Sequence, residues 1–331
     1  MTKSKRGSKG QRRGPKSQAK RDKRWADRLD PTKLKAAQLK KPVVIHRIKS
    51  FPMEFVGGKP CGATVRRAYR TTAAELETLP LHGKILLPLD HLEPDTMPPD
   101  TPPYLIIRLE HLVTADQQHG LWHQWDRLLA ANPQHQLKPD PNRSTSQAYH
   151  FGVWEVTGNT PRLTSDTAKQ TPEAVAAIDN LLRFIQTYIA PKIAGIYKEH
   201  APSHWEALLR ANARVIEVLG SKLQSRPSLR MGGPFFTVAA KEAGSGVIHI
   251  DWNDDRAIYA FVFAVGDWEG GEFCAPQLGI KIPVRPGQVL CVLARVVAHF
   301  SAPVTSGRRI VFTCFTDRLL FRHSDPVIIV G

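Results

Sequence analysis

The sequence predicts an α+β fold in which a layer of helices supports a β core of the jelly-roll type, preceded by a disordered basic tail. Apolar side chains recur at helical spacing between about residues 105 and 225. From about residue 228 to 323, short β-like runs alternate with turn residues. The distribution of charge separates the tail, residues 1–42, from what we predict to be a single catalytic domain over residues 43–331.

The helical region contains three amphipathic segments. HGLWHQWDRLLAA (119–131) places its Trp and Leu side chains on one face. A second segment runs from the predicted N-cap Thr171, which is followed by a proline, to Pro191. The spacing Ser203-x-x-Glu206 is that of a capping box and predicts the start of a third helix. We expect this helix to end at Gly220.

The β-rich region consists of short apolar runs separated by Gly, Pro, Asp and Ser. Short strands with turn signals at regular spacing are typical of a sandwich or a barrel. We predict a hairpin turn over residues 267–271 and a second turn at Pro286-Gly287. The runs are PFFTVAA, GVIHIDW, AIYAFVFAVG, GIKIPV, GQVLCVLARVVAHF and RRIVFTCF.

The positive charge of the chain is concentrated in its first 42 residues. They hold 16 of the 46 Lys and Arg residues but 3 of the 30 Asp and Glu residues, so the remainder carries 30 basic and 27 acidic side chains. A segment this charged and this poor in apolar residues does not fold alone. We expect it to contact nucleic-acid phosphates and to direct the protein to the nucleus, or otherwise leave it cytoplasmic. An inert, solvated arm is the alternative.

Composition also excludes several classes of protein. No stretch reaches the roughly 18 apolar residues of a membrane helix, so we expect no membrane partner. The N-terminus lacks the apolar core of a secretory signal, so we expect a protein that is not secreted. Cys61, Cys274, Cys291 and Cys314 show no C-x-x-C spacing, which favours buried, reduced thiols over a zinc site or a disulfide framework.

A metal site is indicated by the pair His249-x-Asp251 in the run IHIDW. In a strand, side chains two residues apart project from the same face. His299 follows 50 residues later in VVAHF. Two histidines and one carboxylate form the facial triad that binds non-haem iron(II) and leaves positions open for a bidentate ligand and dioxygen. A buried histidine that only satisfies hydrogen bonds is the alternative for each residue.

A cation follows the second histidine at a spacing of ten residues. Arg309 begins the apolar run RIVFTCF, so its side chain can point inward, whereas alternation turns the neighbouring Arg308 outward. A 2-oxoglutarate molecule that chelates iron projects a second carboxylate, and a buried guanidinium can bind it through two parallel hydrogen bonds. We therefore predict Arg309 as the cosubstrate anchor.

Three sequence blocks together resemble the double-stranded β-helix core of the Fe(II)/2-oxoglutarate dioxygenases. They are HIDWNDD (249–255), AVGDWEGGEFCAPQLG (264–279) and RPGQVLCVLARVVAHF (285–300). In detail they are similar to the fungal TET/JBP-like oxygenases, relatives of the ten-eleven-translocation and J-binding proteins. The resemblance implies Fe(II), 2-oxoglutarate and O2 as cofactor and cosubstrates. It also implies His249, Asp251 and His299 as catalytic iron ligands and Arg309 as the anchor.

The same resemblance, with the basic tail, implies oxidation of methyl groups on nucleic-acid bases. Removal of the methyl group from 6-methyladenine or oxidation of 5-methylcytosine in DNA would both fit, and the base would have to leave the duplex. Trp252, Asn253 and Asp254 follow the metal motif and are candidates for substrate contact, although a polar loop is an equal reading of the last two. A prolyl-type protein hydroxylase and an inactive nucleic-acid-binding relative remain as alternatives.

Overall fold

The computed structural model describes residues 44–45, 62–89, 101–138, 141, 144, 146–156, 158, 160–242 and 246–324. These residues all belong to one compact unit, Val43–Gly331. The predicted basic tail and Cys61 lie outside the described residues.

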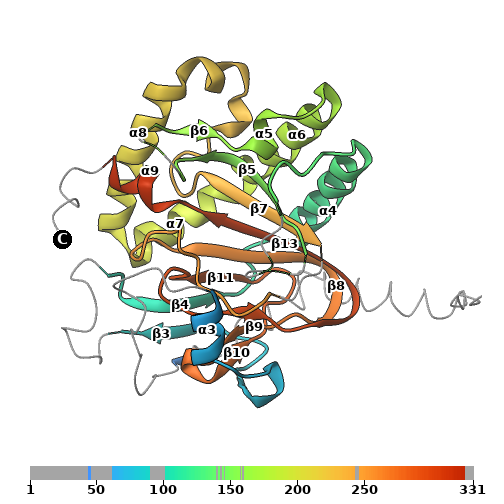
Figure 1. Cartoon of the computed structure of the whole chain (residues 1–331), viewed down its shortest axis with the longest axis vertical. Coiled ribbons are helices and arrows are strands. Elements are labelled where there is room, and N and C mark those ends of the chain that lie inside the picture. The colour runs from blue at the N-terminus through green and yellow to red at the C-terminus, as the bar shows by residue number, and fades with distance from the viewer. Residues whose placement is uncertain are drawn as a thin grey trace, which may run out of the picture. The chain divides into compact units, whose positions relative to one another are not determined.

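A large, almost entirely antiparallel sheet forms the centre of this unit (Figure 1). Its strands are β1 (Val44–Ile45), β3 (Ile85–Pro88), β4 (Tyr104–Leu109), β5 (Tyr149–Trp154), β6 (Arg162–Leu163), β7 (Thr237–Glu242), β8 (Ala260–Gly270), β11 (Val289–Val292) and β13 (Val304–Phe315). They are ordered β1-β3-β4-β11-β8-β13-β7-β5-β6, and only β1 and β3 pair in parallel. The long pairing of β8 with β13 lies in the middle of the sheet.

A smaller sheet of four strands completes the jelly roll. Its strands are β2 (Glu77–Thr78), β9 (Phe273–Ala275), β10 (Ile280–Ile282) and β12 (Phe300–Ser301), in the order β12-β9-β10-β2. The chain passes from β8 directly into β9 through a turn at residues 271–272. The predicted hairpin turn over 267–271 is wrong, because residues 267–270 still pair with β13 and the next strand, β9, belongs to the other sheet. The predicted turn at Pro286-Gly287 is confirmed.

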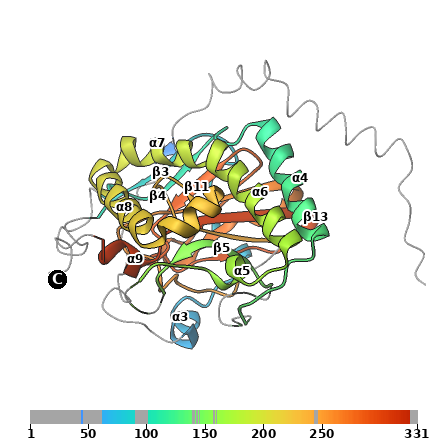
Figure 2. The same ribbon diagram turned by 90° about the horizontal axis from the view of Figure 1, so that it is seen from above.

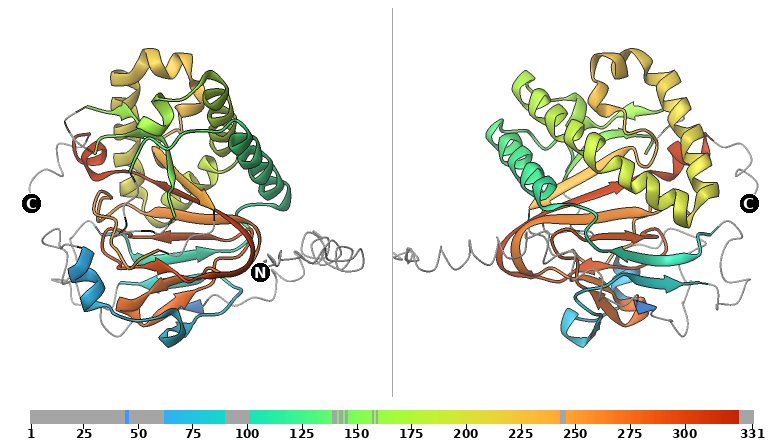
Figure 3. Two further views of the ribbon diagram at one scale, coloured as in Figure 1. Left: turned by 45° about the vertical axis from the view of Figure 1, so that its right-hand side comes forward. Right: turned by 180° about the vertical axis from the view of Figure 1, so that it is seen from behind.

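Helices cover one face of the large sheet, as predicted (Figures 2 and 3). The helices are α3 (Gly62–Ala68), α4 (Ala115–Ala130), α5 (Ser165–Ala168), α6 (Pro172–Tyr188), α7 (Ala190–His200), α8 (Pro202–Ser225) and α9 (Arg318–Arg322), with short 3-10 turns at Ala73–Glu75, Pro227–Leu229 and Pro276–Leu278. Helices α4, α6, α7 and α8 form the covering layer, whereas α3 lies on the opposite side of the sheet (Figure 2). None of the helices in the described part is long and apolar enough to cross a membrane.

The predicted start of α6 is confirmed, and the predicted ends of α8 are wrong. Thr171 caps α6 by accepting a hydrogen bond from the Ala174 amide at 3.3 Å. Helix α8 already begins at Pro202, whose fixed φ suits a first turn, so Ser203 lies inside the helix and caps nothing. Gly220 does not end it either. The helix kinks at Leu219 (φ −108°, ψ 15°) and continues to Ser225.

Strands from the predicted helical region also enter the sheet. Strand β4 pairs with β11 and β5 pairs with β7, so residues 105–225 are not purely helical and the β core is larger than residues 228–323. Both strands are six residues long and mostly buried. Short apolar runs of this kind do not reveal their type by periodicity alone, and their pairing partners lie far away in sequence.

Strand β13 separates the two sides of the molecule. Its side chains Ile310, Phe312 and Cys314 face the helices and are fully buried. The Phe312 ring packs edge-on against Trp125 of α4, with ring centroids 6.1 Å apart. Cys274, Cys291 and Cys314 are buried free thiols, which confirms the prediction for these three. The residues of opposite parity in β13 face the other way, toward the smaller sheet.

An ionic network joins α4 to the central sheet. The carboxylate of Glu242, at the end of β7, accepts hydrogen bonds from Trp125 Nε1 at 2.7 Å and from the Arg308 guanidinium. Arg308 also forms an ion pair with Asp126 at 2.7 Å. The guanidinium of Arg308 is therefore engaged on the helical side of the sheet.

This network predicts a dependence of stability on acid. The hydrogen bond from Arg308 holds the pKa of Glu242 below its ordinary value of 4.5, although burial opposes it. Below 4.5 the unfolded carboxylate binds more protons than the folded one, so the free energy of unfolding falls as the pH falls through the lowered pKa. In Glu242→Gln this loss should be absent. The difference in the free energy of unfolding between wild type and variant should therefore become smaller as the pH falls.

Urea unfolding at a series of pH values measures this gap. Glu206→Gln, which removes an exposed carboxylate from α8, is the matched control and should follow the wild type. Parallel pH profiles for wild type and Glu242→Gln would show that the ion pair does not contribute.

Candidate metal centre

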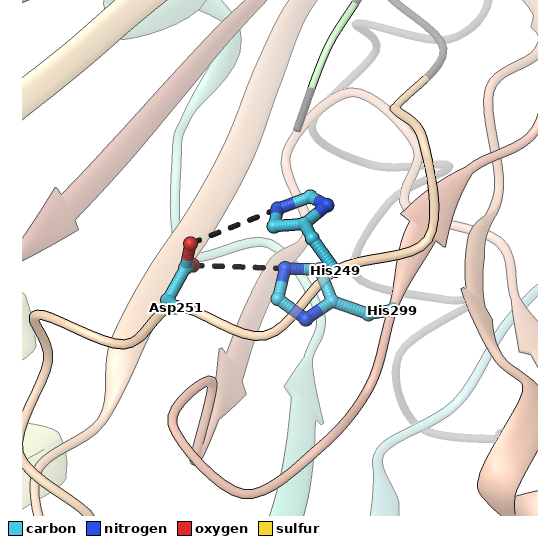
Figure 4. Close-up of side chains that lie close together, drawn as sticks. All are labelled: His249, Asp251 and His299. Carbon is cyan, nitrogen blue, oxygen red and sulfur yellow. Dashed lines mark ion pairs between the residues drawn. The ribbon is translucent and has the colours of Figure 1, made fainter. Parts of the chain in front are cut away.

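Two histidines face each other across an isolated pair of backbone hydrogen bonds. The His249 amide donates to the His299 carbonyl at 3.0 Å, and the His299 amide donates to the His249 carbonyl at 2.8 Å. Their ring centroids lie 4.5 Å apart. Asp251 completes the group, with Oδ1 3.7 Å from His249 Nε2 and Oδ2 3.6 Å from His299 Nε2 (Figure 4).

These three side chains could hold a metal ion. One donor atom from each lies within 4.8 Å of the others, and no other group of this kind occurs in the described ranges of the chain. Two imidazoles and one carboxylate suit iron(II), which tolerates mixed nitrogen and oxygen ligands. His299 is further enclosed by the Phe273 ring, which stacks on it with centroids 5.1 Å apart.

Backbone carbonyls set the orientation of both imidazoles. His249 Nδ1 lies 2.6 Å from the carbonyl of Val247, and His299 Nδ1 lies 2.9 Å from the carbonyl of Val297. A carbonyl can only accept, so each Nδ1 carries the proton and donates it. The lone pair is then on Nε2, the atom that faces Asp251 in both rings. Histidine ligands of metal ions are characteristically held in this way.

The sequence predicts a strand at the His249-x-Asp251 pair. This prediction is wrong, because the pair lies outside the regular strands. His249 is a single bridge residue, and Asp251 follows it in an irregular segment. Their side chains still converge, because the Asp251 amide donates to the Ala294 carbonyl at 3.0 Å while His249 pairs with His299. Long-range backbone hydrogen bonds, and not strand alternation, bring the two ligand atoms together.

A cavity of about 350 Å³ adjoins this group. From His249, Asp251 and His299 it extends over β8, β11, β13 and β7 to β5. Most of its surface is apolar, and a few polar groups reach into it, as is usual for ligand sites. Its aromatic and polar lining includes His150, Trp154, Phe273, Phe315, Asn253 and Asp254.

Arg309 lies on the face of β13 that turns toward the smaller sheet. Val311 and Thr313, on the same face, line the cavity. Only 3% of Arg309 is exposed, and its Nε and one terminal nitrogen have no hydrogen-bond partner in the described part of the chain. Burial lowers the pKa of Arg309 to about 10, although Glu272 opposes the shift. A buried guanidinium with free donors is costly to leave unsatisfied and fits a carboxylate ligand well.

Gly271 makes room for this guanidinium. Its φ is +70°, and a Cβ at this position would lie 3.0 Å from both Cδ and Nε of Arg309. Two residues further along, Phe273 stacks on His299. The turn between β8 and β9 therefore contacts Arg309 with one residue and a predicted metal ligand with another.

The three candidate substrate residues do not share one position. Asn253 and Asp254 line the cavity together with the metal group. Trp252 is not among its lining residues, and its ring packs instead under the guanidinium of Arg295, 4.0 Å away. Sequence reasoning had passed over His150 and Trp154, although their even spacing in YHFGVW would have placed both on one face of a strand.

A jelly roll that gathers two histidines, one carboxylate and a buried, unsatisfied arginine defines a class, the non-haem iron oxygenases that use 2-oxoglutarate. The family Tet_JBP, described as the oxygenase domain of the 2OGFeDO superfamily, matches residues 149–318. This match covers half of the chain and includes every predicted ligand and the anchor. The chain belongs to this family and is an Fe(II)- and 2-oxoglutarate-dependent dioxygenase.

Several solved structures show a distant similarity to this chain. "NgTET1 in complex with 5mC DNA" is 10% identical, with a TM-score of 0.43 over 78% of this chain and 88% of that one. The viral collagen prolyl hydroxylase of Paramecium Bursaria Chlorella virus-1 is 15% identical, with a TM-score of 0.30 over 64% and 94%. OsALKBH1 is 13% identical, with a TM-score of 0.35 over 63% and 97%. No curated protein matches the chain. These likenesses are distant, so the family assignment rests on the match over residues 149–318.

The convergence of three donor atoms predicts which substitutions abolish metal binding. With Fe(II) and 2-oxoglutarate under anaerobic conditions, the wild type should show a weak visible charge-transfer band. His249→Ala should lose this band and bind Fe(II) more than about tenfold more weakly. Mutating a residue that only orients a metal ligand already lowers metal affinity by about 10–100-fold, and removing the ligand itself should lower it at least as much. His123→Ala removes an exposed histidine from α4 and is the control. An unchanged band in His249→Ala would refute the ligand assignment.

Proposed function

We propose that this dioxygenase oxidises methyl groups on nucleic-acid bases, with 5-methylcytosine or 6-methyladenine in DNA as the substrate. The match of residues 149–318 to the Tet_JBP oxygenase domain carries this proposal, since that segment contains both the metal group and most of the cavity. A hydroxymethyl group on carbon five of cytosine persists. On the exocyclic nitrogen of adenine it falls apart, which amounts to demethylation.

In this proposal His249 and His299 hold the iron through Nε2, Asp251 holds it through its carboxylate, and Arg309 binds 2-oxoglutarate. The bound iron and cosubstrate supply the activation of dioxygen and the oxidation of a C–H bond. The protein's own contribution is positioning. Two parallel hydrogen bonds from the Arg309 guanidinium would fix the remote carboxylate of 2-oxoglutarate, and Phe273 shields one face of the His299 ring from water.

The remaining lining of the cavity suits a planar heterocycle. The His150 ring lies 5.8 Å from that of Trp154 and 6.3 Å from that of Phe315, so three aromatic groups gather at the β5 end. Asn253 and Asp254 offer hydrogen-bonding groups for the polar edge of a base. A base would have to leave the duplex to enter, at a cost of a few kcal/mol of unstacking.

The basic tail supports a nucleic-acid partner and a nuclear location. Its 16 Lys and Arg residues would bind phosphates without regard to sequence and would offset part of the cost of extruding a base. Such contacts add affinity and carry no sequence information, so the choice of base would rest with the cavity.

Mass spectrometry of defined pools after turnover tests the proposed substrate. Methylated DNA, methylated RNA and proline-containing peptides are incubated separately with Fe(II), 2-oxoglutarate and oxygen. We expect 5-hydroxymethylcytosine, or loss of the methyl group of 6-methyladenine, in the DNA pool together with succinate. His249→Ala should form neither product. Hydroxyproline in the peptides without any change in the nucleic acids would refute the proposal.

The cosubstrate role of Arg309 predicts an asymmetry between two adjacent arginines. Arg309→Ala should raise the KM for 2-oxoglutarate more than about tenfold, because a hydrogen bond to a charged group is worth roughly 1.5–3 kcal/mol. Arg308→Ala, the matched control, should leave this KM unchanged and lower stability instead, since Arg308 is paired with Glu242. Steady-state kinetics at varied 2-oxoglutarate measures both. A larger rise in this KM for Arg308→Ala than for Arg309→Ala would show that Arg308 is the anchor instead.

A further inference from the structure

Four arginines lie close together beside the wall of the cavity, and one of them, Arg295, packs over the ring of Trp252. They come from parts of the chain that are far apart in sequence: the segment after the metal motif, the segment before His299, and helix α9. We call them the arginine cluster. Its members are Arg256, Arg295, Arg318 and Arg322.

Each segment of the cluster is tied to a residue that lines the cavity. Arg295 directly follows Ala294, which lines the cavity and accepts the hydrogen bond from the Asp251 amide. Arg256 stands two residues after Asp254, another lining residue. The Arg318 amide donates to the carbonyl of Asn253 at 2.7 Å. The cluster is therefore held next to Asn253 and Asp254, the cavity-lining residues that follow the metal motif.

The positive charges of the cluster are largely uncompensated. Burial and then the charges of Arg318, Arg322 and Arg256 lower the pKa of Arg295 to about 10, so Arg295 lies close enough to these three guanidiniums to be repelled by them. Asp255 opposes this shift and forms an ion pair with Arg322 at 3.0 Å. Within the described part of the chain, Arg256, Arg295 and Arg318 form no ion pair.

The cluster is also shaped to hold a ligand. The Arg295 guanidinium is fixed 4.0 Å over the Trp252 ring, so part of its conformational freedom is already lost. Arg318 is exposed, and Arg256, Arg295 and Arg322 are half-buried, so all four can be reached from outside. Planar guanidiniums match the geometry of phosphate oxygens, and a polyanion would relieve their mutual repulsion.

We propose that the arginine cluster binds the phosphodiester backbone of the nucleic acid whose base enters the cavity. The inference rests on the proposed function for the identity of the polymer. Phosphate binding by the cluster would account for the position of Trp252, whose ring packs against Arg295 and does not line the cavity. Phosphate contacts fix the position of a strand without reading its sequence, so the cluster should bind methylated and unmethylated strands alike.

A charge-removing double variant of the full-length protein tests this inference. Arg256→Gln/Arg318→Gln removes the two charges that hold no structural partner and leaves Arg295 on Trp252 and Arg322 on Asp255. Binding of a labelled oligonucleotide is measured without oxygen or 2-oxoglutarate at several salt concentrations. The slope of log affinity against log salt should become shallower by about 1.4 for a single strand and about 1.8 for a duplex, for two lost phosphate contacts.

Two further variants show whether charge at this place matters. Arg127→Gln/Arg183→Gln removes two exposed arginines from α4 and α6 on the helical side of the sheet and should leave the slope unchanged. Arg256→Lys/Arg318→Lys keeps the charges and should keep the slope. An unchanged charge-transfer band confirms that each variant still folds around its metal site.

The outcomes separate this inference from the proposed function. A wild-type salt slope in Arg256→Gln/Arg318→Gln would overturn the cluster's role, even if methylated bases are oxidised. Loss of binding to poly-glutamate of equal charge, with oligonucleotide binding intact, would overturn it in favour of an acidic protein partner. If the slope changes as expected while no base is oxidised, phosphate binding stands and the proposed function fails.

Discussion

The backbone pairing of His249 with His299 is the constraint on which the site depends. Two mutual amide–carbonyl hydrogen bonds hold together segments 50 residues apart. One carbonyl two residues before each histidine then fixes its ring, so both Nε2 atoms turn toward Asp251. No single element could create this convergence. It exists only after the jelly roll has brought the two segments side by side.

Strand β13 carries a second constraint, because its two faces serve different purposes. Arg308 is engaged with Glu242 and Asp126 on the helical side, whereas Arg309 is buried on the cavity side without a complete set of partners. A slip of the strand by one residue would exchange the two guanidiniums. Its antiparallel register with β8 prevents such a slip, since every one of the ten residues from Phe261 to Gly270 is paired with β13. The ion pairs of Arg308 and the burial of Arg309, the proposed cosubstrate anchor, therefore depend on the same pairing.

The sequence predicts the parts of this molecule that local chemistry determines. The cap at Thr171, the helical layer and the β-rich second half follow from spacing and turn residues, and the inward direction of Arg309 follows from alternation. Contacts between distant segments could not be predicted in this way. Strand β4 enters the sheet through β11, about 180 residues later. The arginine cluster likewise unites Arg256 with α9, and no pattern in either segment reveals the other.

Burial decides which ligand each group of arginines can accept. Arg309 is 3% exposed, so only a small molecule already inside the protein can reach its free donors. A polymer cannot enter that space, but it can reach the arginine cluster, whose members are half-buried or exposed. Arg309 and three members of the cluster lack an ion-pair partner in the described part of the chain, and a ligand that compensates such a charge would offset the cost of burying it. The two sites are attached to different segments around the metal group, because Arg309 lies against Gly271 in the segment that leads to Phe273 and His299, whereas the Arg318 amide bonds to Asn253. A strand held by the cluster would then present its base to the cavity from a segment other than the one that contacts Arg309, the proposed cosubstrate anchor.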